Sequence, residues 1–140
     1  MIKINNRVDY QTQMWYTNKN TIDGGENMCN KSQAIQILAQ AYLMCRDIFG
    51  EKLRDAYLYG SYARGDYDDE SDVDILMTVD MSAEELSLIR HRVSSVNSEL
   101  SLEHDVTVSI TAKPLEQFTR YSGILPYYRN VLSEGIRYAG

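Results

Sequence analysis

A pair of aspartates inside an alternating apolar segment constrains this chain more than any other feature of its 140 residues. The segment 71–79 reads SDVDILMTV, and its alternation predicts a β-strand. Because strand side chains alternate between the two faces, Asp72 and Asp74 should emerge on one face, opposite an apolar one. Two carboxylates at that separation repel each other unless a cation lies between them. We therefore predict a metal-binding strand, with an apolar face made of Val73, Ile75, Met77 and Val79.

A glycine–serine pair precedes this strand at a short interval. Gly60-Ser61 follows the segment 56–59, whose sequence AYLY predicts a strand, and ten residues separate Ser61 from Asp72. Glycine permits a turn in which backbone N–H groups lie against a phosphate. A phosphate-binding turn beside a carboxylate pair is suited to chemistry on a nucleoside triphosphate.

A third carboxylate is expected on a later strand. From Asp105 onward the sequence DVTVSI alternates polar and apolar residues, which predicts a strand. We expect this strand to run antiparallel to that of Asp72 and Asp74, which would place Asp105 beside them. Glu103 lies one step earlier on the same face and is the competing candidate, but we favour Asp105.

The spacing of these residues resembles a known signature. Gly60-Ser61, ten residues and then an Asp-Val-Asp triplet ending at Asp74 is similar to the motif of the DNA polymerase beta-type nucleotidyltransferase superfamily. The string GSYARG at 60–65 and the small size resemble its minimal nucleotidyltransferase (MNT) branch. The resemblance extends over about residues 30–135 and is specific, because several elements must coincide in order.

The resemblance implies a role for each matching residue. The three aspartates would be the catalytic carboxylates and would hold two Mg²⁺ ions, with ATP as substrate. The Gly-Ser turn would bind the triphosphate, and Arg64 would reach a phosphate, although an ion pair with Asp66 is the alternative for Arg64. The site residues implied in this way are Asp72, Asp74 and Asp105 for catalysis and metal binding, and Gly60, Ser61 and Arg64 for nucleotide binding.

The acceptor of the transferred group is expected to come from another protein. Only 35 residues follow Asp105, whereas larger relatives such as aminoglycoside nucleotidyltransferases resemble this core with an added helical acceptor region. Proteins of the MNT branch are commonly encoded beside a HEPN-domain protein. The resemblance therefore implies an antitoxin that attaches AMP to a tyrosine of a HEPN ribonuclease.

Two alternatives stay open at this point. One is a nucleotidyltransferase for a small-molecule acceptor such as an antibiotic, with its pocket completed by oligomerisation. The other is a non-catalytic nucleotide-binding module that regulates a partner, and the complete set of carboxylates counts against it.

Composition excludes several other classes. The net charge is −6, the pI is about 4.8, and six of the 20 acidic residues lie within 66–74. Because non-specific binding to nucleic acid needs clustered Lys and Arg, a templated polymerase is not expected. Cys29 and Cys45 lack metal-like spacing, and no apolar run approaches the length of a membrane span. We expect a cytoplasmic protein with reduced thiols and no membrane partner.

The coarse organisation predicts one α+β domain over residues 28–140, in which helices cover a small mixed sheet. Asn30 and Gly50 should bound a first helix, a capping box at Ser82 should start a second, and a last one should run from Pro126 to Glu134, with Gly135 as its stop. The first helix should bury Ile35, Leu38, Tyr42, Cys45 and Phe49, and the second Leu86, Ile89, Val93, Val96 and Leu100.

Residues 1–27 differ from the rest of the chain. They are rich in Asn and Gln and show little periodicity. We expect an N-terminal arm that is either disordered or upstream of a natural start at Met28, because Gly24-Gly25-Glu26 permits a codon sequence like a ribosome-binding site.

Overall fold

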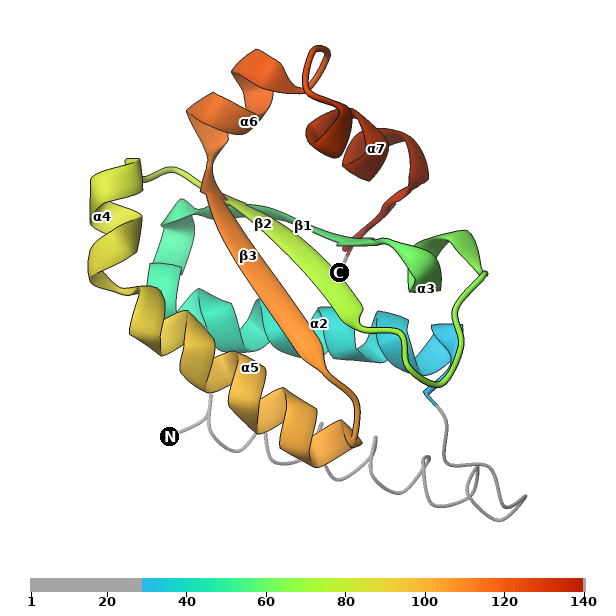
Figure 1. Cartoon of the computed structure of the whole chain (residues 1–140). Coiled ribbons are helices and arrows are strands. Elements are labelled where there is room, and N and C mark those ends of the chain that lie inside the picture. Colours follow the sequence, from blue (N-terminus) through green and yellow to red (C-terminus); the bar gives the residue numbers. More distant parts are fainter. Residues whose placement is uncertain (1–28, 140) are drawn as a thin grey trace.

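The computed structural model describes residues 29–139, so the predicted arm 1–27 and the start at Met28 lie outside the described residues. A four-stranded mixed sheet carries helices on both faces, which confirms the predicted α+β class (Figure 1). The elements are α2 (Lys31–Phe49), η1 (Gly50–Lys52), β1 (Leu53–Tyr59), α3 (Ser61–Arg64), β2 (Val73–Val79), α4 (Ala83–Leu88), α5 (Arg90–His104), β3 (Val108–Pro114), α6 (Leu115–Tyr121), α7 (Pro126–Glu134) and β4 (Ile136–Arg137).

The sheet has the strand order β3-β2-β1-β4. Strand β1 is antiparallel to both β2 and β4, whereas β2 and β3 are parallel. Our expectation of an antiparallel third strand was therefore wrong. The physical reason is the connection: helices α4 and α5 carry the chain back along the sheet, and such a crossover returns the next strand parallel to the first.

Helix α2 begins and ends where the sequence predicted. Asn30 and Gln33 form a reciprocal capping box, with the Gln33 N–H donating to Asn30 Oδ1 at 2.8 Å, and Gly50 ends the helix at φ +63°. The predicted apolar face was partly wrong, because Ile35 is 41% exposed and Tyr42 is only partly buried. The buried face is rotated relative to the predicted one, and its apolar residues are Ala34, Ile37, Leu38, Ala41, Met44, Cys45 and Phe49.

The second predicted helix is divided into α4 and α5. Ser82 and Glu85 form the expected capping box, but Ile89, at φ −117°, interrupts the helix. Asn97 and Ser101 of α5 accept hydrogen bonds from the backbone N–H groups of β3, which is an edge strand. The predicted stripe is buried at Leu86, Val93, Val96 and Leu100, with Ile89 partly buried.

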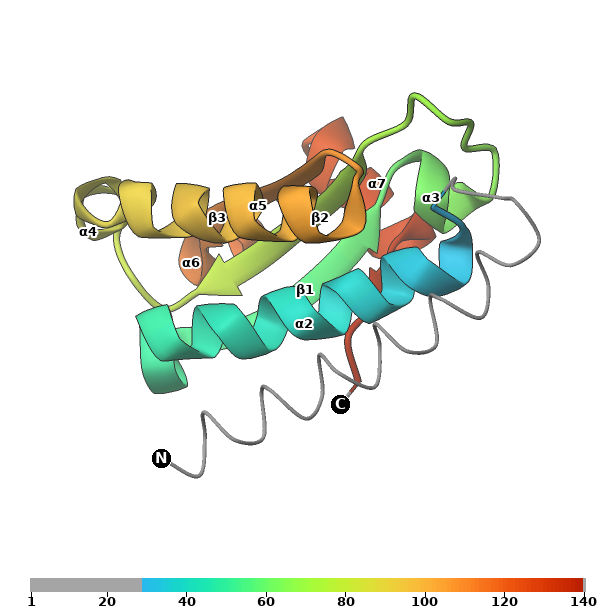
Figure 2. The same ribbon diagram turned by 90° about the horizontal axis from the view of Figure 1, so that it is seen from below.

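The two faces of the sheet hold different cores. Helices α2 and α5 lie side by side on one face, where the predicted apolar residues of β2 are fully buried (Figure 2). Helices α6 and α7 cover the opposite face, the face of Asp74 (Figure 1). The core of this second face consists of Tyr57, Leu76, Phe118, Tyr128 and Val131.

The last elements close the sheet beyond β1. Pro126 starts α7 and Gly135 ends it, as predicted, while Pro114 precedes the first residue of α6. The two-residue strand β4, which the sequence did not predict, pairs with Tyr57 and Leu58. No helix in the described part is long and apolar enough to cross a membrane. Cys29 and Cys45 are buried free thiols, and burial raises the pKa of Cys45 to about 12.

Candidate active site

Backbone pairing brings the Gly-Ser turn against the carboxylate pair. Tyr59, the last residue of β1, lies opposite Asp74 of β2, so Gly60 emerges directly beside the Asp74 side chain. A Cβ atom added at Gly60 would lie 2.8 Å from Asp74 Oδ2, and Gly60 has φ +83° and ψ −156°. Position 60 therefore requires glycine both for its backbone conformation and for its contact with the carboxylate.

The two aspartates lie at the start of β2. Asp72 immediately precedes the strand and is exposed, whereas Asp74 is half-buried within it. Burial raises the pKa of Asp74, and the neighbouring charge of Asp72 raises it further. Both effects disfavour the ionised form of Asp74. A cation bound at the pair would offset both effects, and metal binding by Asp72 and Asp74 stays a prediction.

The turn after Gly60 is a single helical turn, α3. The carbonyl of Gly60 accepts hydrogen bonds from the N–H groups of Ala63 and Arg64 at 3.1 and 3.0 Å, and Gly65 ends the turn at φ +95°. The first N–H groups of such a turn have no acceptor within it. Ser61 begins α3 directly after Gly60 and is partly exposed.

Arg64 forms an ion pair with Asp66, the alternative to a phosphate contact in the sequence analysis. Its guanidinium lies 3.2 Å from Asp66 Oδ2 and 3.5 Å from Glu134 Oε1 at the end of α7. The side chain of Arg64 is 44% exposed, so these are solvent-screened ion pairs. A phosphate contact of Arg64 remains a prediction.

Asp105 does not lie on the third strand. Helix α5 continues to His104, and Asp105 ends it in the left-handed region at φ 54° before β3 starts at Val108. Because β2 and β3 are parallel, both strands start at the same end of the sheet. Asp105 and Asp72 precede these two strands and line a common pocket of about 430 Å³. The alternative candidate, Glu103, instead accepts hydrogen bonds from the Gln40 amide between α2 and α5.

Among residues 29–139, no group of three or more His, Cys, Asp or Glu side chains lies close enough together to hold one metal ion. The position opposite Asp74 on β3 is occupied by Ser109. The sequence could have pointed to Ser109, because the alternation from Asp105 onward places Thr107 and Ser109 on the polar face of the segment. Asp72 and Asp74 can supply two oxygen ligands, and Mg²⁺ commonly completes its shell with water and substrate phosphates.

The acidic residues before the pair have a local structural role. Asp68 accepts hydrogen bonds from the Glu70 N–H and the Ser71 hydroxyl, which orders the turn leading to Asp72.

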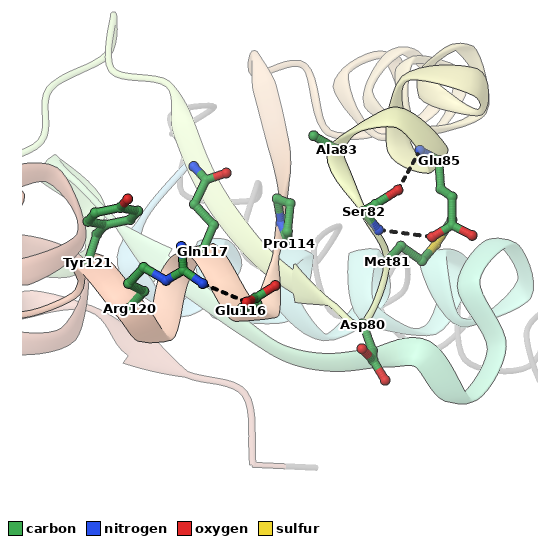
Figure 3. A pocket seen from close by; sticks show the side chains of 10 residues that line it. All are labelled: Asp80, Met81, Ser82, Ala83, Glu85, Pro114, Glu116, Gln117, Arg120 and Tyr121. Atoms are coloured by element: carbon green, nitrogen blue, oxygen red, sulfur yellow. Dashed lines mark hydrogen bonds and ion pairs between the residues drawn. The ribbon is translucent and has the colours of Figure 1, made fainter.

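A second hollow of about 530 Å³ lies at the opposite end of β2, after Val79 (Figure 3). Its polar side chains are largely engaged with one another: Arg120 donates to Glu116 at 2.6 Å, and Ser82 and Glu85 form the cap of α4. The strand separates this hollow from the carboxylate pair, and we assign it no part in the candidate active site.

A small mixed sheet that holds a Gly-Ser turn against paired carboxylates defines a class of enzymes that act on nucleoside triphosphates. Residues 44–138 match the nucleotidyltransferase domain family, and the chain belongs to this family. The resemblance based on the Gly-Ser and Asp-Val-Asp motifs is thereby confirmed, and the protein is a nucleotidyltransferase.

Two proteins of Methanocaldococcus jannaschii, both provisionally named as protein adenylyltransferases, are similar to this chain. The first is 35% identical over 79 residues, which cover 55% of this chain and 76% of that protein. The second is 30% identical over 106 residues, which cover 76% of this chain and 95% of that protein. A crystal structure of a mutant of the toxin–antitoxin MntA–HpeT superimposes with a TM-score of 0.47 at 18% identity, covering 80% of this chain and 74% of that chain.

Proposed function

We propose that this nucleotidyltransferase moves AMP from ATP to a hydroxyl group of a partner protein in a Mg²⁺-dependent reaction. The observation that carries the proposal is the contact between the Gly-Ser turn and the carboxylate pair, because phosphate binding and metal binding would then occur at one place. The names of the two similar proteins support AMP as the transferred group and a protein as the acceptor.

Asp72 and Asp74 are the proposed metal ligands. The half-buried Asp74, whose pKa is raised by burial and by Asp72, fits a bound cation, since a cation would favour the ionised form of both groups. Bound Mg²⁺ would neutralise charge on the triphosphate and activate the acceptor hydroxyl. Asp105 remains the proposed ligand of a second ion and the proposed proton acceptor. What supports this role is that Asp105 lines the same pocket as Asp72.

The reaction would be an in-line transfer. The acceptor oxygen attacks the α-phosphorus, a new P–O bond forms, and pyrophosphate leaves as the bond to the bridging oxygen breaks. The hydroxyl proton passes to a carboxylate, for which Asp105 is the proposed base. Backbone N–H groups after Gly60 and the hydroxyl of Ser61 are proposed to bind the leaving phosphates.

Arg64 is the proposed third nucleotide-binding residue. Its two present partners, Asp66 and Glu134, are exposed carboxylates, and solvent screens such pairs so that they contribute little to stability. The guanidinium can therefore exchange a carboxylate for a phosphate oxygen at little cost.

For the partner, we propose a HEPN-family protein, with this chain as the antitoxin that modifies it in the cytoplasm. Support comes from the family resemblance at positions 60–74 and from the protein-directed names of the two relatives. The acceptor residue of such a partner would reach the carboxylates from the open side of the Asp72–Asp105 pocket.

The test uses ATP labelled at the α-phosphate, Mg²⁺ and the product of the neighbouring gene. Label bound covalently to the partner protein is the expected result. Label on a small acceptor such as an antibiotic would show that the substrate is a small molecule and not a protein, which is the first alternative in the sequence analysis. Tight nucleotide binding with no transfer to any acceptor would contradict the proposed reaction.

A further inference from the structure

The sheet face that carries Asp74 is covered by a continuous series of aromatic rings. Each ring contacts the next, with centroid separations of 5.8, 5.0, 5.3 and 5.6 Å. The series runs from β1 through α6 and α7 and returns to β1, ending at the residue opposite Asp74. Its members are, in order, Tyr57, Phe118, Tyr128, Tyr127 and Tyr59.

The last ring lies across the central strand. Tyr59 is on β1 and Thr111 is on β3, yet the Thr111 side chain is near enough to interact with the Tyr59 hydroxyl, so the phenol of Tyr59 extends across the face of β2. The Tyr59 hydroxyl also forms a 3.0 Å hydrogen bond with the Tyr127 hydroxyl of α7. Three hydroxyl groups from three elements thus meet beside Asp74.

The hydroxyl groups and rings beside Asp74 offer contacts for an uncharged polar ligand. A neutral phenol can donate and accept hydrogen bonds, as sugar hydroxyls and base edges require. Tyr127 is 39% exposed, which leaves part of its ring available for contact with another flat group.

The two sides of Asp74 differ in charge. The pocket of Asp72 and Asp105 is also lined by Asp69 and Glu70, so four carboxylates surround it. The opposite side, toward α7, presents the neutral hydroxyls and rings. Because the nucleoside is bonded to the α-phosphate, it must lie within a few ångströms of the carboxylate pair, and the neutral aromatic side suits it better than the acidic pocket.

We propose that Tyr59, Thr111 and Tyr127 form the subsite for the nucleoside half of the nucleotide, with the base against the Tyr127 ring and the ribose against the hydroxyls. This inference rests on the proposed nucleotidyl-transfer function, and it leaves the acidic pocket to the acceptor. The residue after Tyr59 is Gly60, so the nucleoside and the phosphates would be bound by consecutive residues of one strand end.

The test compares nucleotide and phosphate binding by titration calorimetry of the full chain with Mg²⁺. The probes are ATP, 2′,3′-dideoxy-ATP and inorganic tripolyphosphate. Tyr127→Ala should weaken ATP binding about tenfold, because stacking of a base on an aromatic ring contributes substantially, and it should leave tripolyphosphate binding unchanged. Tyr121→Ala is the matched control, since Tyr121 is an exposed aromatic residue outside the series, and it should change neither affinity.

Two conservative variants keep the test decisive if Tyr127→Ala fails to fold. Tyr127→Phe and Thr111→Val retain the packing volume and remove one hydroxyl each, so they should reduce the preference for ATP over dideoxy-ATP severalfold. An equal loss of ATP and tripolyphosphate affinity, or no loss in any of the three variants, would overturn the subsite. If wild-type protein bound none of the three probes, the proposed function itself would fail.

Discussion

Gly60 and Asp74, fourteen positions apart in the sequence, are in contact at the end of the β1–β2 pair, where a methyl group on Gly60 would lie 2.8 Å from Asp74 Oδ2. This contact fixes the distance between the Gly-Ser turn, which we propose binds phosphate, and the carboxylates. Substitution of Gly60 therefore tests whether the site depends on this contact.

Gly60→Ala should reduce both stability and transfer. The φ of +83° with extended ψ is a region that only glycine adopts readily, so alanine should cost about 1–3 kcal/mol before any clash. Gly65→Ala is the matched control, because Gly65 has φ +95° but no atom within 4 Å of an added Cβ. Urea unfolding should show a larger loss for Gly60→Ala. Equal losses would mean that the Asp74 contact is unimportant.

Asp74→Asn should stabilise the metal-free protein while removing Mg²⁺ binding. The raised pKa of Asp74 means that the folded state holds its proton more tightly than the unfolded state, so ionisation of Asp74 lowers stability as pH rises through the carboxylate range. The gain at neutral pH should be below about 1 kcal/mol, because solvent screens this half-exposed group.

Thermal unfolding with and without Mg²⁺ checks this prediction. Wild-type protein should be stabilised by the ion, and Asp74→Asn should lose that stabilisation. A variant that is less stable without metal and still stabilised by Mg²⁺ would show that Asp74 has a structural role instead.

Asn97 protects the edge of the sheet. Its Oδ1 accepts the Ile110 N–H at 2.9 Å, so Asn97→Leu should leave an edge-strand donor without this partner and cost about 1–2 kcal/mol. Glu99→Ala, an exposed change on the same helix, should have little effect. Urea midpoints that fall equally in both variants would count against a specific role for the Asn97 contact.

His104 should make stability pH-dependent in mild acid. Burial lowers its pKa, partly opposed by Glu103, so the unfolded state takes up a proton first as pH falls. Stability should therefore decrease from about pH 6.5 down to the lower pKa of the folded state. His104→Gln should flatten this part of the curve, whereas His91→Gln, an exposed control, should not. A wild-type slope retained in His104→Gln would refute the assignment.

Much of this architecture could be predicted because local signals and burial agree. The caps at Asn30 and Ser82 and the apolar face of β2 follow directly from short sequence patterns. The direction of β3 was missed because periodicity says nothing about strand polarity. The length of the intervening helical segment did contain that information, since a helix crossover favours parallel strands.

The candidate site was predicted only in part, because some of its contacts depend on tertiary structure. The contact between Gly60 and Asp74 follows from the spacing of the motif. Asp105 was wrongly placed on a strand, because the polar–apolar alternation of the sequence begins at Asp105 whereas the strand begins at Val108. The Tyr59–Tyr127 hydrogen bond joins residues 68 apart in sequence and depends on how α7 lies over the sheet. Helix placement of this kind is a tertiary property that no short pattern encodes.

The most direct test of the account measures transfer from α-labelled ATP to the partner protein with Mg²⁺, comparing wild type with Asp72→Asn, Asp74→Asn and Asp80→Asn. Asp80 is an exposed carboxylate at the opposite end of β2 and serves as the control. We predict a loss of about a hundredfold or more in the first two variants and a near wild-type rate in the third. Wild-type transfer by Asp74→Asn would contradict the assignment of this carboxylate pair as the catalytic centre.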